Sequence, residues 1–442
     1  MALDQAAIAP SRLGEVFRSR DFRLLWGGQF VSLLGDQFFL VALPWLVLQL
    51  TGDPLAIGVV LAVSAAPRAV FLLLGGVLID RFSPRAVMLF SNIGRTILVA
   101  VLALLTITGS VQLWMLYAFG FLLGLGYALF LPAQSVIVPR LVPEGRLQTG
   151  NAIIQGTTQL ALFIGPVTAG ILITLLAHTG TAAARVPQTS GIALVFALDA
   201  AGFMVSAITL ALIASPLVRR DRGRHVIRSS VLRSLGAGLA DVWRDKTLRH
   251  YFVLIGAVNL ALLGPLSVGV PVLGHTRFSG GAFAYGAVLS GLGAGALAGV
   301  VAGGVLRRPL GRAFAAAMLG STVVLGIGLA MLGALPSAGS AVGATFLIGL
   351  AEGYLIVQFI TWIQVRTSRE QLGRMMSILL VISIGQAPLS NLVAGLLMKF
   401  SVSLVMIAAG SLIVLVAVTA AFSPSVWKFS ENCVRAAGAG ER

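Results

Sequence analysis

Twelve long apolar stretches, separated by short polar loops, restrict what this chain can fold into. Each is about 20 residues or longer, which is enough for a helix to cross the hydrocarbon core of a bilayer. The stretches lie at 24–50, 55–79, 87–108, 112–138, 152–176, 192–215, 251–273, 283–306, 313–334, 340–364, 375–398 and 402–423. We therefore expect an all-α membrane protein with twelve transmembrane helices.

Composition supports a bilayer as the solvent of this chain. Of its residues, 57% are hydrophobic and only 10% are charged, whereas a soluble domain has about a quarter of its residues charged. The net charge of +16 could indicate nucleic acid, but the Arg and Lys residues lie in short loops, where they meet anionic lipid headgroups. We expect membrane lipids as partners and no nucleic acid.

The sequence has few features of a soluble enzyme or of a metal-binding protein. The only cysteine is Cys433, and the four histidines lie in or beside loops without the spacing of metal ligands. The chain has no phosphate-binding loop pattern, which disfavours direct use of ATP. We expect no enzyme activity, no metal and no cofactor, and a proton gradient as the energy source.

The chain also repeats itself. GGVLIDRFSPRA from Gly75 is similar to GGVLRRPLGRA from Gly303, and RLVPEGRLQTGNA from Arg140 is similar to QVRTSREQLGRMM from Gln364. These matches predict two pseudo-symmetric six-helix bundles, at 1–215 and 251–442 (with the tail), joined by a polar cytoplasmic hinge at 216–250. Repeated membrane halves are typical of secondary transporters.

Positive charge predicts the orientation of the helices. The loops on one side carry nearly all the arginines, including nine Lys or Arg in the hinge, whereas the opposite loops contain only Arg185, Arg277 and Lys399. Because positive loops stay on the cytoplasmic side, both termini and the hinge are expected in the cytoplasm.

One loop resembles a signature of a known family. GVLIDRFSPR, from Gly76, is similar to the loop between helices 2 and 3 of the major facilitator superfamily, with matches at Gly76, Asp80, Arg81 and Arg85. Ser83 and Pro84 depart from that pattern. The resemblance implies a latch, in which Asp80 caps helix 11 and pairs with a loop arginine to close the cytoplasmic side. A carboxylate at a helix N-terminus is stabilised by the helix dipole; an ordinary interface charge is the alternative.

Within that superfamily the chain resembles the 12-helix macrolide and siderophore exporters. The resemblance is carried by RDFRLLWGGQFVSLLGDQ from Arg20, LPAQSVIVPRLVPEGRL from Leu131 and EQLGRMMS from Glu370. GPVTAG is similar to the antiporter motif of helix 5, with Gly165, Pro166 and Gly170 in place. The arginine that helix 4 often supplies for proton coupling is replaced by Gly120. The resemblance implies a monomer in the bacterial cytoplasmic membrane.

The coupling of transport to protons is then expected to depend on other charged residues inside the apolar stretches. We single out Asp36, Arg68, Asp199 and Glu352, because a charged residue at a helix centre costs at least about 2.5 kcal/mol unless it is paired or wetted. Asp36 and Glu352 lie on helices that line the cavity in this superfamily, so they are our proton-coupling candidates. Arg68 is the expected charge partner of Asp36, which leaves a purely structural Asp36 as the alternative. We expect Asp199 to be structural.

The expected substrate surface is large and mostly apolar. Aromatic and amide side chains at helical spacing suit bulky amphipathic molecules better than sugars, although amides also hold membrane helices together. The candidates for this surface are Tyr127, Phe130, Gln155, Gln159, Asn259, Tyr354, Gln358, Trp362 and Gln386.

Three functions remain open. The residues and the resemblance favour a proton-coupled exporter of amphipathic compounds such as drugs or siderophores, which works by alternating access. A lipid or lysolipid flippase, or a facilitator without proton coupling, is the first alternative. A membrane receptor or scaffold that transports nothing is the second, and buried carboxylates in two similar halves argue against it.

Overall fold

The structure is a computed structural model, and it describes residues 10–79, 83–142, 146–177, 189–213, 243–306, 309–367, 369–424 and 426–427. The described residues are almost entirely helical and contain no strand. The chain divides into two compact units. Unit 1 comprises 1–52, 63–228 and 280–290, and unit 2 comprises 53–62, 229–279 and 291–442. The hinge expected at 216–250 lies largely outside the described residues, so its limits stay a prediction.

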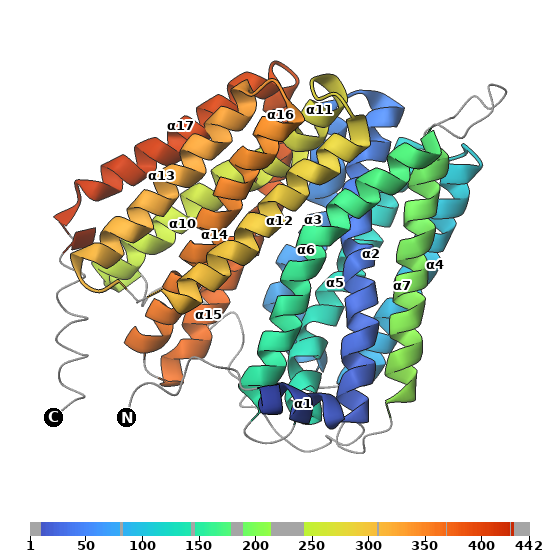
Figure 1. Ribbon diagram of the computed structural model, residues 1–442, viewed down its shortest axis with the longest axis horizontal. Coiled ribbons are helices and arrows are strands. Elements are labelled where there is room, and N and C mark those ends of the chain that lie inside the picture. The colour runs from blue at the N-terminus through green and yellow to red at the C-terminus, as the bar shows by residue number, and fades with distance from the viewer. Residues whose placement is uncertain are drawn as a thin grey trace. The chain divides into compact units, whose positions relative to one another are not determined.

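Unit 1 is built mainly from the first seven helices (Figure 1). Their bounds are α1 Pro10–Arg18, α2 Arg20–Thr51, α3 Pro54–Ile79, α4 Pro84–Ile107, α5 Leu113–Leu141, α6 Leu147–Ala177 and α7 Thr189–Leu212. Ser19 and Ser83 begin α2 and α4 as N-caps, because each side chain accepts a hydrogen bond from the first turn.

Unit 2 is built mainly from the helices that follow the hinge (Figure 1). Their bounds are α10 Lys246–Gly264, a π-helical turn Pro265–Gly269, α11 Val270–Thr276, α12 Gly281–Val305, α13 Arg312–Ala334, α14 Ala338–Arg366, α15 Arg369–Ile384, α16 Ala387–Met398 and α17 Val402–Ala421.

The prediction of an all-α protein with twelve transmembrane helices is confirmed. Twelve helical stretches of the described residues are long and apolar enough to cross a bilayer. Two of them are irregular. The span Leu248–Thr276 contains the π-helical turn at Pro265, and the span Ile378–Met398 is interrupted at Gly385 and Gln386, just before Pro388. Proline has no backbone N–H and clashes with the preceding turn, so it explains both interruptions.

The centre of unit 1 is the packing of α2 and α4 against α7. Glycine permits the close approach: a side chain at Gly202 of α7 would meet the backbone of Val31 in α2 at 3.0 Å. At one end of the bundle, Phe22, Leu25 and Met88 belong to a fully apolar core that α1 covers. α2 and α7 run side by side in Figure 1.

A glycine stripe joins α12 to α14 within unit 2. Gly295 and Gly299 of α12 lie against the backbone of Phe346 and Leu350, while Gly349 and Gly353 of α14 lie against the backbone of Leu292 and Ala296. Small residues bring membrane helices into van der Waals contact that larger side chains would prevent.

Each unit includes one short segment from a distant part of the chain. In unit 2, the start of α3 packs on α16, where Gly58 faces Gly395 and the Nζ atom of Lys399 lies 3.4 Å from a carboxylate oxygen of Asp53. In unit 1, the start of α12 packs on α6 in the same manner, through Gly286 and Gly170. In both segments, glycine allows the backbones of the two helices to come into close contact.

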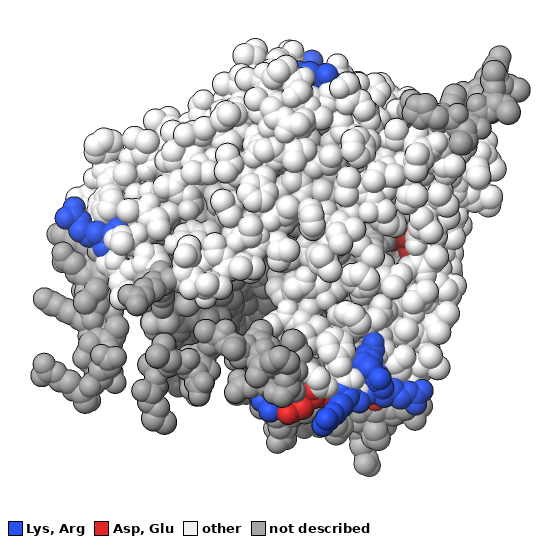
Figure 2. All heavy atoms as spheres, viewed as in Figure 1, with Lys and Arg blue, Asp and Glu red and all other residues white. Residues whose placement is uncertain are grey.

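Most of the charge on the face shown in Figure 2 lies at the ends of the helices. The flanks of the helices are almost entirely uncharged there, and Lys and Arg gather at the end of unit 1 where α1 lies. Large apolar side chains such as Phe90 are exposed on the outside, with 72% of Phe90 accessible. A bilayer would cover such a surface, so the pattern fits a multi-pass membrane protein.

Candidate functional site

Asp36 forms an ion pair inside the helix bundle of unit 1. Its partner is Arg95 of α4, which donates from Nη2 to a carboxylate oxygen of Asp36 in α2. The Arg95 side chain is only 6% exposed, and that of Asp36 is 21% exposed. The pair therefore has a buried cationic member and a partly exposed acidic member.

Arg68 is not the direct partner of Asp36, so that prediction is wrong. The guanidinium of Arg68 instead lies over the ring of Tyr127 in α5, with its central carbon 4.3 Å from the ring centroid. Arg68 interacts with Asp36 only through space. Arg68 follows Pro67 within α3, where its side chain projects toward α5, whereas Arg95 on α4 reaches the carboxylate.

Aromatic rings enclose Arg95. Its guanidinium carbon lies 3.8 Å from the centroid of the Phe203 ring in α7 and 5.7 Å from that of Tyr127. Ring faces attract cations, and they do so more strongly where water is excluded. Tyr127, predicted as a substrate contact, is therefore part of this charged cluster.

Asp199 also belongs to the cluster. It is fully buried on α7, and its carboxylate packs against Gly35, the residue that precedes Asp36. It interacts electrostatically with Asp36 and Arg95. Neither of its oxygens has a hydrogen-bond donor among the described residues. We define the charged cluster of unit 1 by these members: Asp36, Arg68, Arg95, Tyr127 and Asp199.

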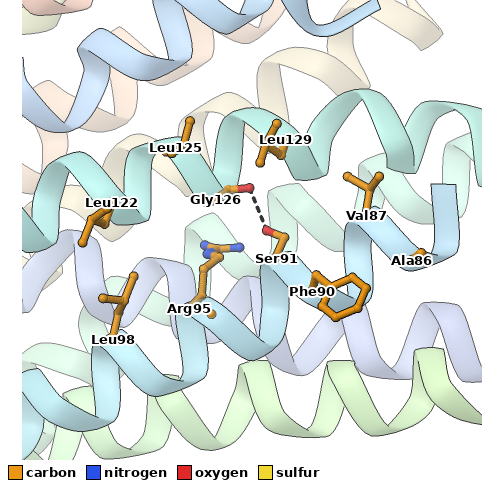
Figure 3. A pocket seen from close by; sticks show the side chains of 11 residues that line it. Ala86, Val87, Phe90, Ser91, Arg95, Leu98, Leu122, Leu125, Gly126 and Leu129 are labelled. Atoms are coloured by element: carbon orange, nitrogen blue, oxygen red, sulfur yellow. Dashed lines mark hydrogen bonds between the residues drawn. The ribbon is translucent and has the colours of Figure 1, made fainter. Parts of the chain in front are cut away.

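A cleft of about 410 Å³ opens between α4 and α5, beside this cluster. Figure 3 shows its walls of aliphatic side chains and Phe90, with Arg95 reaching inward and Ser91 donating a hydrogen bond to the carbonyl of Gly126. Ser91 and Arg95 are the polar side chains among its lining residues. The cleft thus combines apolar walls with one edge of the charged cluster.

Glu352, the other coupling candidate, lies in the middle of α14 in unit 2. It is partly buried, and no ion-pair or hydrogen-bond partner is found for it in the part of the chain that the structure describes. It therefore stands apart from the charged cluster of unit 1.

The predicted latch is only partly within the described residues. Gly76 lies in the last turns of α3, whereas Asp80 and Arg81 lie outside them. Arg85 is described: its Nε and Nη2 donate to the carbonyls of Leu210 and Ala211, at 2.8 and 2.6 Å. Arg85 therefore caps the C-terminal end of α7, where a cation is favoured by the helix dipole. The latch itself stays a prediction.

The antiporter-like motif, with Gly165, Pro166 and Gly170, lies on α6. Gly165 packs on the side chain of Gln37 in α2, and Gly170 packs on the backbone of Ala282 in α12. Pro166 disturbs the hydrogen bonding of the helix around it, and the backbone N–H of Val167 donates to Ser290 Oγ at 2.9 Å. Neighbouring side chains satisfy a proline-bent membrane helix in this way.

A family model described as the Major Facilitator Superfamily, which the loop signature had indicated, matches residues 25–387, most of the chain. The chain belongs to the Major Facilitator Superfamily.

Several transporters of this superfamily resemble the chain along most of its length. It is 24% identical over 371 residues to the macrolide efflux protein A of Streptococcus pyogenes, a match that covers 81% of this chain and 84% of that protein. It is 25% identical over 368 residues to the multidrug efflux pump Tap of Mycolicibacterium fortuitum, covering 82% and 85%. The enterobactin exporter EntS of Escherichia coli is 24% identical over 275 residues, covering 56% and 63%.

Solved structures with the same fold are also transporters. The nucleoside transporter NupG superimposes with a TM-score of 0.72 at 14% identity, over 91% of this chain and 99% of that one. A bacterial homologue of the human lysosomal transporter Spinster gives 0.67 at 14% identity, over 95% and 98%. At such identities the match concerns the fold alone.

Three of the predicted substrate contacts of this superfamily member are packed side chains. Phe130 belongs to the apolar core of unit 1, and Trp362 is 1% exposed, in an aromatic cluster with Tyr251 and Phe359. Gln358 is also buried and donates to the carbonyl of Gly303 at 3.3 Å. Because a fully packed side chain offers no surface to a substrate, we reassign these three to helix packing.

The remaining candidates keep accessible surface. Gln155 is exposed on α6, and Gln159, one turn further, is partly exposed. Asn259 and Tyr354 are partly exposed on α10 and α14, and Gln386 lies at the break between α15 and α16, where its Nε2 donates to Ile382. Their role in substrate binding stays a prediction.

Sequence reasoning overlooked Arg95 and did not foresee that Asp199 lies beside Asp36. Arg95 is an ionisable residue inside the third apolar run, so the rule that singled out Asp36 applied to it equally. The position of Asp199 beside Asp36 carried no such signal, because α2 and α7 are distant in the sequence.

Proposed function

We propose that this chain is a secondary active exporter of amphipathic small molecules, such as drugs or siderophores, driven by protons moving in the opposite direction. Substrate would be exposed alternately to the two sides of the membrane. The chain would act as a monomer in the bacterial cytoplasmic membrane, with both termini in the cytoplasm. Three relatives, whose names specify macrolide efflux, multidrug efflux and enterobactin export, support the substrate class.

The charged cluster of unit 1 is the observation that carries proton coupling. Two arginines and two aspartates within membrane-spanning helices are costly, so such residues are kept for pathways of ions or protons. Asp36 is partly exposed while its partner is buried, and an acid so placed can exchange protons when the aqueous phase reaches it. The apolar walls of the neighbouring cleft are suited to amphipathic molecules rather than to sugars.

A transport assay tests this function. The purified protein is reconstituted in liposomes, and a pH gradient is imposed in the presence of erythromycin or of the lipophilic cation tetraphenylphosphonium. We expect accumulation against the concentration gradient, abolished by a protonophore. Equilibration that is insensitive to the pH gradient would contradict coupling and favour a facilitator.

The flippase alternative is tested in the same liposomes. The cleft between α4 and α5 is apolar with Arg95 at one side, which would also suit an acyl chain next to an anionic headgroup. Fluorescent lysophospholipid is therefore the control cargo. Its translocation, with no transport of erythromycin or the cation, would replace the exporter by a flippase.

A further inference from the structure

Among the described residues of the charged cluster of unit 1, Asp199 and Arg95 each have a polar group without a hydrogen-bond partner. Each could supply the partner that the other lacks. Both carboxylate oxygens of Asp199 are buried without a hydrogen-bond donor, and the Nε of Arg95 is buried without an acceptor, among the residues that the structure describes. An ionised carboxylate in such surroundings carries a large desolvation penalty. A proton on Asp199 would remove that penalty while Arg95 is engaged with Asp36.

The charged groups around Asp199 come from few elements. α2 contributes Asp36 and α4 contributes Arg95, whereas α6, which also packs on α7, has no titratable residue. Arg68 and Tyr127, from α3 and α5, act on Asp36 through space. With Asp199 neutral the cluster has one positive charge in excess, and ionised Asp199 balances it.

We propose that Asp36 and Asp199 form a proton-exchange pair around Arg95. In one arrangement Arg95 is bound to ionised Asp36 and Asp199 holds the proton. In the other, Arg95 is bound to ionised Asp199 and the proton is on Asp36. The proton moves between two carboxylates and nothing else is consumed.

The two acids differ in exposure. Asp36 is 21% exposed at its side chain, whereas Asp199 is fully buried. In this proposal protons therefore enter and leave through Asp36, whereas Asp199 holds the proton in the buried part of the cluster. The pair is the proton carrier of the exporter, and this assignment rests on the proposed function. The protonation of Asp199 is independent of the proposed function.

Infrared spectroscopy tests the pair without any substrate. In the purified protein at neutral pH, we expect a carbonyl stretching band of a protonated carboxylic acid that disappears in Asp199→Asn and persists in Glu352→Gln. The Asn side chain is nearly isosteric and neutral, so the fold should be kept, as thermal unfolding would verify. A spectrum of Asp199→Asn that retains the whole band of the wild type would overturn the proposal.

A second variant tests the exchange itself. In Asp36→Asn, Arg95 loses its acid and is free to bind Asp199, so Asp199 should ionise and its band should vanish although Asp199 is present. Persistence of the Asp199 band in this variant would show that Arg95 does not change partners and would refute the exchange.

A transport assay then distinguishes failure of the proton-exchange pair from failure of the proposed exporter function. In liposomes with a pH gradient and erythromycin as probe, Asp199→Asn should lose uphill accumulation, whereas Glu15→Gln, which alters a surface ion pair with Arg146, should behave as the wild type. Uphill transport retained by Asp199→Asn overturns the carrier role. Absence of pH-driven transport in the wild type contradicts the exporter instead, while the infrared bands still decide whether the pair exists.

Discussion

At the scale of single residues, the buried ion pair of Arg95 is the most consequential interaction in this chain. Arg95 pairs with Asp36 and stacks on Phe203, and it interacts electrostatically with Asp199. Removing one member of a buried pair leaves the other charged and desolvated, which costs more than the pair itself contributes.

Arg95→Gln should therefore destabilise unit 1 strongly, by up to about 3 kcal/mol. Asp36→Asn should cost less, because Asp199 can replace the lost acid. The measurement is the midpoint of thermal unfolding in detergent. Arg146→Gln is the control: its partner Glu15 is 2.7 Å away but exposed, and such pairs contribute about 1 kcal/mol or less. Equal losses for Arg95→Gln and Arg146→Gln would contradict a buried pair.

Glu352 has a different expected role because it lacks an arginine partner in the described part of unit 2. Glu352→Gln keeps the shape and removes the charge, so we expect normal binding of erythromycin, measured by equilibrium titration, with loss of pH-driven accumulation. The double variant with Asp36→Asn decides whether either of these two carboxylates couples transport to protons. Undiminished uphill export in the double variant would show that neither does.

At the scale of helices, glycines and terminal caps control the packing. The stripe on α12 and α14 lets two backbones approach closely. The C-terminal end of α7 is capped from α4 by Arg85. Both devices join elements that are separated in the sequence.

Gly349→Ala should push α14 away from α12. A β-carbon there would lie 2.7 Å from the backbone nitrogen of Ala296, and overpacking of this kind costs about 1–3 kcal/mol. Gly343→Ala on the same helix is a matched control, since nothing lies within 4 Å of its β-carbon. Thermal unfolding should be lowered by the first substitution only, and equal behaviour would contradict the close packing.

Arg85→Gln should weaken the end of α7. The loss of a cation at a helix C-terminus costs about 1 kcal/mol, and hydrogen exchange should rise at the amides of the last turn of α7. Arg85→Lys should restore part of the protection through its charge. If exchange in this turn stays as in the wild type, the cap contributes nothing to stability.

At the scale of the whole molecule, the distribution of positive charge predicts the orientation in the membrane. The cytoplasmic loops are expected to hold nearly all Arg and Lys residues. A reporter fused after Arg442 should therefore be cytoplasmic, and one inserted between α6 and α7 should be external. Activity of both reporters on the same side would rule out the twelve-helix topology.

What the sequence determined by itself is the set of spanning helices and the family. Apolar runs of bilayer length can satisfy their backbone hydrogen bonds only as helices, so their number followed from hydropathy alone, and the loop from Gly76 indicated the superfamily. Hydropathy could not foresee the π-helical turn at Pro265 or the break at Gln386, because each depends on how proline is accommodated by neighbouring helices.

Which buried charges meet follows from the packing of the helices, not from the sequence pattern. Asp36, Arg95 and Asp199 stand on three helices, and their contact depends on how those helices rotate and pack around glycines such as Gly35. Rotation also decided that Phe130 and Trp362 face packed cores. Helical spacing places residues on one face of their own helix, but it contains no information about which helix that face meets.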